Sequence, residues 1–266
     1  MGALDGRVAL VTGGSRGIGR AIAERLAADG AACALTYRKE AERAKEVVAA
    51  IEGAGGRALA LPLDLGEPEQ AAPVVARVSE VFGRIDVLVA SAAATAFRPM
   101  LEQRPHNVRR TFAITVESFV ALVQAAVPLM PPAGGRILMI SGIDTFQALH
   151  GHGVLGGAKA AAESMVRTLA LELGPRGVTV NGVVPGFIET DSSTIYVSQG
   201  LGLDYEAATR RLRETTPLRR HGTPADVAAL VAFLASEAAA WITGQNIVID
   251  GGLTITSPMT RMAASP

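Results

Sequence analysis

The sequence has little cysteine, few aromatic residues and no excess of charge of either sign. Its one cysteine, Cys33, excludes a disulfide framework and a zinc site built from cysteines. Cys33 lies within the apolar run Ala32–Tyr37, where we expect it to be a small, buried hydrophobic side chain. The 266 residues include 25 basic and 25 acidic side chains, so the chain carries no electrostatic footprint for nucleic acid.

Long hydrophobic runs are also missing. No segment contains 18 consecutive apolar residues, and the N-terminus lacks the apolar region of a signal peptide. We therefore expect a cytoplasmic protein with no membrane or nucleic-acid partner. What the sequence does contain is a large apolar fraction, 49%, in which alanine and glycine are abundant. This composition suits helices packed closely on a sheet, and the length is compatible with one α/β domain.

Short apolar runs rich in β-branched residues alternate with helical patterns along the chain. Strands are predicted at Val8–Thr12, Ala32–Tyr37, Ala58–Leu63, Val87–Ala90, Arg136–Ser141, Val178–Val184 and Asn246–Asp250. Helices are predicted at Ile18–Asp29, Ala41–Glu52, Glu69–Phe82, Asn107–Leu129, Val154–Leu173 and Ala225–Ala235. The last helix is opened by Thr223 and Pro224, a capping hydroxyl followed by a first-turn proline. The alternation predicts a single α/β domain over residues 1–266, with a parallel sheet covered by helices on both faces.

One stretch, Gly186–Thr216, follows a strand but breaks this rhythm with polar and glycine-rich sequence. A long excursion after the carboxyl end of a strand lies where open α/β sheets bind ligands. We therefore expect a substrate lid at about residues 187–216, the alternative being a disordered surface loop. An apolar small-molecule substrate is favoured by the lid residues Phe187, Ile195, Tyr196, Leu201 and Tyr205.

The first predicted strand runs into the sequence TGGSRGIG at Thr12–Gly19, followed by a helix. In this strand–turn–helix context the glycines predict a dinucleotide phosphate site. Gly13 permits the tight turn, Gly17 lets the backbone approach a pyrophosphate, and Gly19 lets the helix lie close to the strand. The free N–H groups and the dipole at the start of the helix favour the anion. The alternative is a merely structural glycine turn.

The end of the second predicted strand indicates which dinucleotide binds. NAD-selective folds usually place a carboxylate there, but this chain has Arg38 and Lys39, with Arg16 nearby in the glycine loop. A guanidinium can bind a phosphate through paired hydrogen bonds, so the pattern predicts NADP(H), the alternative being solvated surface charge. Asp64 and Leu65 close the third strand, where an aspartate can accept a hydrogen bond from the adenine amino group.

These residues resemble the short-chain dehydrogenase/reductase family. The resemblance rests on Thr12–Gly19, Asp64-Leu65, Lys159 in its helix, Val180-Asn181 through Pro185-Gly186, and Gly244-Gln245 through Asp250-Gly251-Gly252. It implies a Rossmann-like, doubly wound sheet of seven parallel strands, a nicotinamide cofactor and a homo-oligomer, either a dimer or a tetramer. It places the cofactor against Gly13, Ser15, Arg16, Gly17, Ile18, Gly19, Arg38, Lys39, Asp64, Leu65, Ala92, Lys159, Pro185, Gly186, Ile188 and Thr190.

The catalytic residues that the resemblance implies are only partly present. The family typically uses Asn, Ser, Tyr and Lys, with the tyrosine four residues before the lysine. Lys159 is present, but Leu155 stands at the tyrosine position and cannot donate a proton. Gly142 stands at the serine position, with Ser141 one residue earlier and pointing to the other face. Thr115 stands at the position of the asparagine. A standard alcohol dehydrogenase is therefore not expected.

One branch of the family departs in a similar way. Its enoyl-acyl carrier protein reductases have the tyrosine six or seven residues before the lysine. The sequence Phe97-Arg98-Pro99 and the ungapped spacing from Ser141 to Lys159 are most similar to the branch with the tyrosine seven residues before. That position here is His152, close to His150. A histidine can donate a proton near neutrality. The alternative is a glycine-rich loop with solvated histidines.

We therefore predict an NADPH-dependent reductase of an activated C=C bond. The substrate would be an enone or an enoyl thioester, the latter bound to coenzyme A or a carrier protein. Hydride addition to such a bond spreads charge into an enolate, which needs only positioned donors. The predicted catalytic residues are Lys159, His152, Thr115 and Ser141, with no metal. Two other functions remain open: non-redox dehydration or cyclisation with the histidines as acid and base, and non-catalytic NADP(H) binding.

Overall fold

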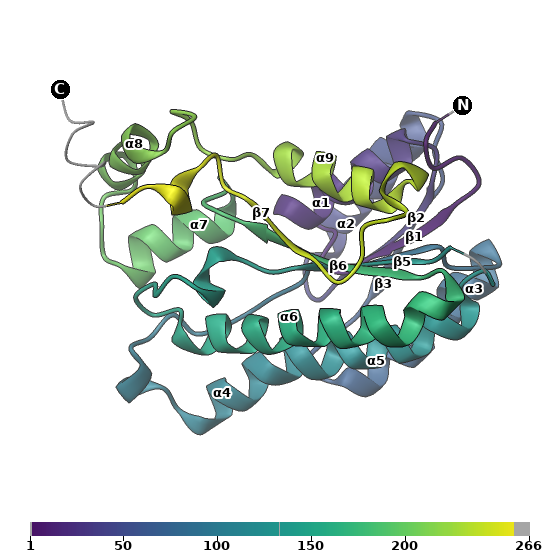
Figure 1. Ribbon diagram of the computed structural model, residues 1–266, viewed down its shortest axis with the longest axis horizontal. Coiled ribbons are helices and arrows are strands. Elements are labelled where there is room, and N and C mark those ends of the chain that lie inside the picture. Colours follow the sequence, from purple (N-terminus) through teal and green to yellow (C-terminus); the bar gives the residue numbers. More distant parts are fainter. Residues whose placement is uncertain (1, 133, 258–266) are drawn as a thin grey trace.

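The computed structural model describes residues 2–132 and 134–257, in which a sheet lies between two layers of helices (Figure 1). The strands are β1 (Val8–Val11), β2 (Ala32–Tyr37), β3 (Ala58–Pro62), β4 (Val87–Ala90), β5 (Arg136–Ile140), β6 (Thr179–Pro185) and β7 (Asn246–Ile249). They form one parallel sheet in the order β3-β2-β1-β4-β5-β6-β7. The order reverses direction between β1 and β4. This confirms the predicted doubly wound, seven-stranded Rossmann-like sheet.

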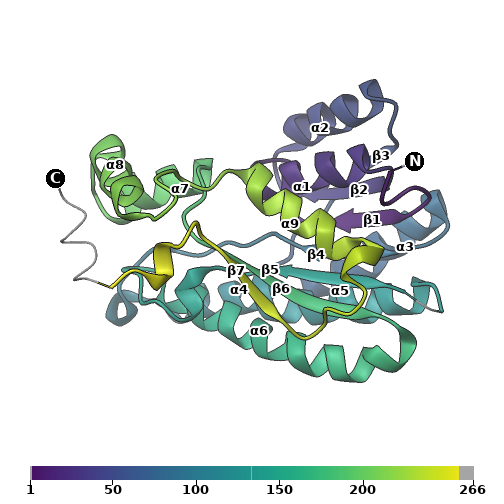
Figure 2. The same cartoon turned by 45° about the horizontal axis from the view of Figure 1, so that its top comes forward.

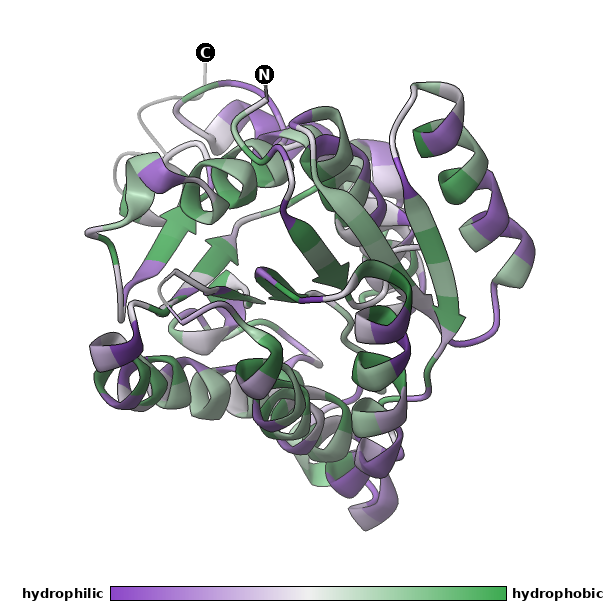
Figure 3. Ribbon diagram, turned by 90° about the vertical axis from the view of Figure 1, so that its right-hand side faces the viewer, coloured by the Kyte–Doolittle hydropathy of each residue, from purple (hydrophilic) through white to green (hydrophobic). Residues whose placement is uncertain are grey.

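Two layers of helices cover the sheet, as Figures 1 and 2 show. One face carries α1 (Gly17–Ala28), α2 (Ala41–Gly53) and α9 (Pro224–Ala235). The other carries α3 (Ala71–Phe82), α4 (Pro105–Phe112), α5 (Ser118–Ala126) and α6 (Gly153–Leu173). Side chains of the strands alternate between the two cores: Ala9 and Val11 face α1, whereas Val8 and Leu10 face the opposite layer. The strands are accordingly apolar over most of their length, with polar residues such as Arg136 and Asn246 at strand starts (Figure 3).

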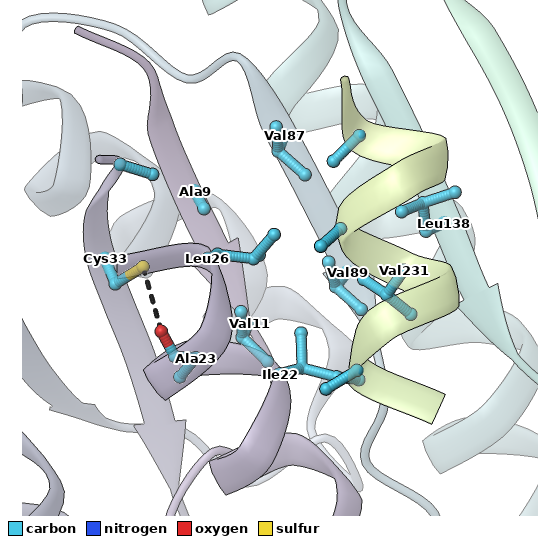
Figure 4. Close-up of a cluster of buried hydrophobic side chains, with 14 of the residues drawn as sticks. Ala9, Val11, Ile22, Ala23, Leu26, Cys33, Val87, Val89, Leu138 and Val231 are labelled. Carbon is cyan, nitrogen blue, oxygen red and sulfur yellow. Dashed lines mark hydrogen bonds between the residues drawn. The ribbon is translucent and has the colours of Figure 1, made fainter. Parts of the chain in front are cut away.

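Cys33 is buried in the core between the sheet and the α1–α9 layer (Figure 4). Its Sγ lies 3.4 Å from the carbonyl oxygen of Ala23, and burial raises the pKa of the thiol to about 12. The prediction of a small, buried hydrophobic side chain is confirmed. A thiol held in this protonated form has little nucleophilic character.

Helix α9 begins as its sequence predicts. The Thr223 hydroxyl accepts from the backbone N–H of Asp226, the Asp226 carboxylate accepts from the backbone N–H of Thr223, and Pro224 occupies the first turn. This reciprocal arrangement is a capping box.

Among the described residues, one helical segment, Pro105–Leu129, has the length and apolar composition of a membrane span. Half of its most apolar window is buried inside the protein, where the segment packs on α3 and α6. The segment is not the uniform helix that was predicted. It consists of α4, a π turn at η3 (Ala113–Glu117), α5, and a final 3-10 turn at η4 (Val127–Leu129).

The 187–216 segment is helical rather than a loop. It contains α7 (Asp191–Ile195), a π turn at η7 (Tyr196–Gly200) and α8 (Tyr205–Thr215). In Figures 1 and 2 the helices α7 and α8 lie together at one end of the molecule, outside the two helix layers. The alternative of a disordered loop does not describe these residues.

Candidate active site

A cleft of about 470 Å³ opens along one edge of the sheet. Its walls come from the segments that directly follow β1, β2, β3, β4 and β5, from the first two turns of α6 and from the 187–216 segment. Ligands of open α/β sheets bind at the carboxyl ends of the strands, beside the point where the strand order reverses. The cleft occupies this position, because it includes the turns after both β1 and β4.

The glycine loop after β1 forms one end of the cleft. Gly13 has a φ of +67°, which L side chains rarely adopt, and so supplies the tight turn. A Cβ at Gly19 would lie 2.3 Å from the carbonyl oxygen of Gly13, so α1 can approach the strand only if residue 19 is glycine. The predicted residues Gly13, Ser15, Arg16, Gly17, Ile18 and Gly19 all line the cleft. No side chain caps the start of α1, so its first N–H groups stay available to an anion.

Arg38 and Lys39 also line the cleft and are exposed to solvent. Asp64 and Leu65 form the neighbouring wall, and Ala92 lies close to the turn at Gly13. The Asp64 carboxylate accepts from the Gly66 N–H at 2.9 Å and lies 3.3 Å from a guanidinium nitrogen of Arg110. Partial burial acts to raise the pKa of Asp64, but the Gly66 hydrogen bond and the Arg110 charge outweigh it and lower the pKa.

One group beside the glycine loop was missed by the sequence reasoning. Asp191, the first residue of α7, lies 2.9 Å from a guanidinium nitrogen of Arg43 and 3.7 Å from one of Arg16. A Cβ at Gly17 would lie 3.5 Å from the methyl group of Thr190. The start of the 187–216 segment therefore contacts the glycine loop. Arg43 gave no signal in the sequence because its position in a predicted surface helix looks like any solvated charge.

At the other end of the cleft, three ionisable side chains meet. The Asp144 carboxylate lies 2.9 Å from His152 Nδ1 through Oδ2 and 3.4 Å from Lys159 Nζ through Oδ1. Its side chain is only 3% exposed. Burial acts to raise the pKa of Asp144, but the hydrogen bond from His152 and the charge of Lys159 prevail and lower it. The structure thus brings the predicted residues His152 and Lys159 together through a carboxylate that the sequence analysis did not single out.

The other ring nitrogen of His152, Nε2, is buried and has no hydrogen-bond partner among the described residues. The imidazole stacks on Phe97, with ring centroids 5.0 Å apart, and meets Tyr196 edge-on at 4.2 Å. The Tyr196 hydroxyl donates to the backbone carbonyl of His150, whose side chain is exposed. Burial raises the pKa of Tyr196, and the Asp144 charge adds to the effect. His152 therefore lines the cleft, and its Nε2 is a buried nitrogen without a hydrogen-bond partner among the described residues.

Leu155 and Gly142 surround the same corner. Leu155 is buried and lines the cleft without any polar group. A Cβ at Gly142 would lie 2.6 Å from Asp144 Oδ1 and 2.7 Å from Lys159 Nζ. The space beside Gly142 is therefore filled by the carboxylate and the ammonium group.

Ser141 and Thr115, two other predicted catalytic residues, are differently placed. Ser141 lines the cleft, but its hydroxyl donates to the Glu163 carboxylate of α6 at 2.5 Å. Thr115 lies in the π turn η3 and lines a separate cavity of about 10 Å³, which also borders Ala92. Its hydroxyl is buried and lacks a partner among the described residues. This geometry gives neither hydroxyl a free approach to a ligand in the main cleft.

Of the residues predicted to contact the nicotinamide end of the cofactor, at the end of β6 and after it, only some line the cleft. Thr190 lines the cleft and caps α7 by accepting from Ser193 N–H. Pro185 ends β6, and a Cβ at Gly186 would lie 2.6 Å from the Cβ of Asp250. Ile188 is buried and forms a bridge with Gly222. Pro185, Gly186 and Ile188 are not among the residues that line the cleft.

His221 anchors the 187–216 segment to the body of the protein. Its Nδ1 lies 2.6 Å from a Glu189 carboxylate oxygen, and its Nε2 lies 2.7 Å from the carbonyl oxygen of Thr209 in α8. Both neighbours are acceptors, so both contacts are hydrogen bonds only when both ring nitrogens carry a proton. The imidazole also packs edge-on against Phe187.

Within residues 2–132 and 134–257 there is no group of three or more side chains suited to hold a metal ion.

Comparison with known proteins gives a match over residues 13–254 to the family model described as enoyl-(acyl carrier protein) reductase. The chain is 38% identical to 1-cyclohexenylcarbonyl-CoA reductase of Streptomyces collinus, over 95% of this chain and 88% of that protein. It is 36% identical to versicolorin reductase 1 of Aspergillus parasiticus, over 94% and 97%.

Solved structures agree with the sequence comparisons. A short-chain dehydrogenase of Burkholderia cenocepacia in complex with NADP superposes with a TM-score of 0.87 at 39% identity, covering 95% of this chain and 99% of that one. A blue fluorescent protein from a metagenomic library, in complex with NADPH, superposes with a TM-score of 0.86 at 36% identity, covering 94% and 99%.

Proposed function

Because the chain belongs to the short-chain dehydrogenase/reductase family, we propose that it is an NADPH-dependent reductase of a C=C bond conjugated to a carbonyl group. The observation that carries this proposal is the corner formed by Leu155, His152 and Lys159. It has a cation and a free imidazole nitrogen, but a leucine where the resemblance implies a phenol. Support also comes from the Streptomyces collinus relative, which is named for the reduction of an unsaturated acyl-CoA.

The cofactor assignment rests on the opposite end of the cleft. Two solved relatives hold NADP or NADPH, and the residues of this chain fit that group. The glycine loop would hold the pyrophosphate at the start of α1, and the exposed cations Arg38 and Lys39 would bind the 2′-phosphate. Lys159 would hold the nicotinamide ribose.

The choice of a C=C bond follows from what the residues can do. When bound, NADPH supplies a hydride. Reduction of a ketone or aldehyde would concentrate charge on a single alkoxide oxygen, and Leu155 offers no donor at the position where the resemblance implies the phenol. Addition to the β-carbon of an enone or enoyl thioester instead gives an enolate, whose charge Lys159 and His152 can stabilise. His152 then delivers the proton from Nε2.

The 187–216 segment would close over the substrate. It contacts the glycine loop at Thr190 and Asp191 and contributes Tyr196 to the wall around His152. Its half-exposed apolar residues Ile195 and Leu203 suit an apolar acyl group. We therefore propose it as a substrate lid within a single domain.

A second function is favoured by one specific observation, the contact between Asp144 and His152. A carboxylate-supported imidazole is also an acid–base pair for dehydration or cyclisation, with no net redox change. In that case NADP(H) would bind but would not be consumed.

The test is an anaerobic single-turnover experiment that follows the absorbance of the reduced nicotinamide. The enzyme–NADPH complex is mixed with a 2-enoyl-CoA, a cyclic enone or a simple ketone. Bleaching with the first two compounds, and little with the ketone, is the expected result. Rapid bleaching with the ketone alone would overturn the assignment. No bleaching with any of them, combined with tight NADPH binding, would favour the non-redox function or a cofactor-binding role without catalysis.

A further inference from the structure

We propose that Asp144 is the positioning residue for His152. We further propose that Gly142 and Gly156 leave the space that Asp144 needs to contact the imidazole. The effect of Asp144 on turnover rests on the proposed reductase function. Its effect on the imidazole does not, because it follows from contacts within this chain alone.

The contacts define what Asp144 does to the imidazole. An ionised carboxylate can only accept hydrogen bonds, so the 2.9 Å contact requires the proton of His152 to lie on Nδ1. In the neutral ring Nε2 is then the basic nitrogen, and in the charged ring it is a donor. A carboxylate behind an imidazole selects the tautomer and stabilises the imidazolium in the same way in unrelated hydrolases.

Two glycines make room for this carboxylate. A Cβ at Gly142 would lie within 2.7 Å of both Asp144 Oδ1 and Lys159 Nζ. A Cβ at Gly156 would lie 2.2 Å from the backbone carbonyl oxygen of Asp144, so the turn that carries Asp144 lies directly on α6. Serine at residue 142 would therefore require the ends of the Asp144 and Lys159 side chains to shift. We infer that the glycine at residue 142 and the present place of the Asp144 carboxylate go together.

Among the described residues, the one charged side chain that forms an ion pair or hydrogen bond with the ring is Asp144. The other printed contacts are the Tyr196 ring from η7 and the Phe97 ring, with Lys159 beyond the carboxylate. Lys159 carries no acceptor, and the Tyr196 hydroxyl already donates to the His150 carbonyl. Among the described residues, the orientation of His152 thus depends on Asp144 and on two aromatic contacts.

The reaction step balances as follows. With NADPH bound, transfer of its hydride would break a C–H bond of the dihydronicotinamide, leave NADP⁺ and form a C–H bond at the β-carbon, while the electron pair of the C=C bond moves into the enolate. The imidazolium of His152 gives its Nε2 proton to the enolate, which leaves a neutral ring with its remaining proton on Nδ1, held by Asp144. A proton from solvent restores the imidazolium. Asp144 itself keeps its charge throughout.

The first experiment needs no substrate. In Asp144→Asn the side-chain oxygen is expected to stay on Lys159, so the amide nitrogen faces Nδ1 and donates to it. The neutral ring must then carry its proton on Nε2. The chain has only four histidines, so ¹⁵N chemical shifts of labelled protein, assigned with His152→Ala, resolve the two tautomers. The expected result is Nδ1–H in the parent and Nε2–H in the variant. The same tautomer in both proteins would overturn the proposal.

The second experiment asks whether Asp144 acts through His152. Asp144→Asn should lower turnover about 10²–10³-fold with little change in NADPH affinity. In a His152→Ala background the same substitution should cost less than about threefold. An equal loss in both backgrounds would show that Asp144 acts by another route and would overturn the proposal.

The glycines supply a matched pair. Gly156→Ala should displace the Asp144 turn and lower turnover at least tenfold. Gly157→Ala, the next residue of the same helix, meets no atom within 4 Å and should leave turnover unchanged. Equal activity of the two variants would contradict the proposed fit. If the parent reduces no enone or enoyl thioester, the proposed function falls, while the tautomer measurement still decides the role of Asp144.

Discussion

The two ends of the cleft are built in different ways. At the end formed by the glycine loop, the important constraints are on the backbone: Gly13 adopts a positive φ, and Gly19 leaves no room for a Cβ. At the end formed by α6, the important groups are side chains that contact one another, Asp144, His152 and Lys159. The first end keeps the pattern that the family resemblance implies. The second departs from it at every polar position except Lys159.

The difference teaches which parts of such a site can change separately. A backbone constraint of this kind accepts only glycine, because any side chain at residue 19 would collide with the Gly13 carbonyl. A side-chain constraint can be met by more than one set of groups, provided that the set changes together. The four positions Gly142, Asp144, His152 and Gly156 form such a set. The scaffold that would bind the cofactor can therefore persist while the acid–base groups are exchanged.

The largest effect is expected from Lys159→Ala, because we propose that Lys159 both holds the nicotinamide ribose and stabilises the enolate. Loss of a hydrogen bond from a charged group should weaken NADPH binding about tenfold or more. Loss of its charge should lower turnover a further 10²–10³-fold. Fluorescence titration of NADPH and single-turnover kinetics measure the two separately. A loss confined to either measurement would contradict this double role of Lys159.

His152→Ala should affect only the α6 end. Turnover is expected to fall about 10²–10³-fold, while NADPH affinity stays nearly constant, since one positioned donor is lost. His150→Ala is the control, because that side chain is exposed and only its backbone carbonyl makes the contact with Tyr196. Full activity in His152→Ala would show that another group, such as bound water, donates the proton.

Arg38→Asp should affect only the glycine-loop end. The parent is expected to bind NADPH at least tenfold more tightly than NADH, equivalent to about 1.4 kcal/mol. The variant should lose that preference because a carboxylate would repel the 2′-phosphate. Dissociation constants for both cofactors provide the measurement. Equal affinities of the parent for NADPH and NADH would contradict the proposal that Arg38 and Lys39 bind the 2′-phosphate.

The smallest effect is expected from Leu155→Tyr. The variant supplies a phenol at the position implied by the family, but Gly142 and Thr115 leave that phenol without hydrogen-bonding partners. Reactivity depends on the geometry of all these groups together. Ketone reduction should rise less than about tenfold, measured as steady-state NADPH oxidation. Vigorous ketone reduction would show that the departures at residues 142 and 115 matter little.

The sequence predicts the parts of this molecule that depend on local chain geometry. Periodicity places all seven strands to within a residue or so, and the turn at Gly13–Gly19 has the predicted conformation. Asp144 was not foreseen, because a carboxylate in a turn is usually solvated and only the packing of that turn on Gly156 buries it. The helices of the 187–216 segment were missed because their glycine-rich, polar sequence lacks a long apolar face.

The attachment of the 187–216 segment has a consequence for its response to ionic strength. At one point Asp191 meets Arg16 and Arg43 through side chains that are about half exposed, and such ion pairs are screened by salt. At the other, His221 is only 7% exposed and its Nε2 contacts the Thr209 carbonyl oxygen of α8, an uncharged acceptor, although its Glu189 partner is half-exposed. Raising the salt concentration should therefore weaken the attachment of the 187–216 segment beside the glycine loop. The attachment of α8 through His221 should persist, so the segment would move about that point.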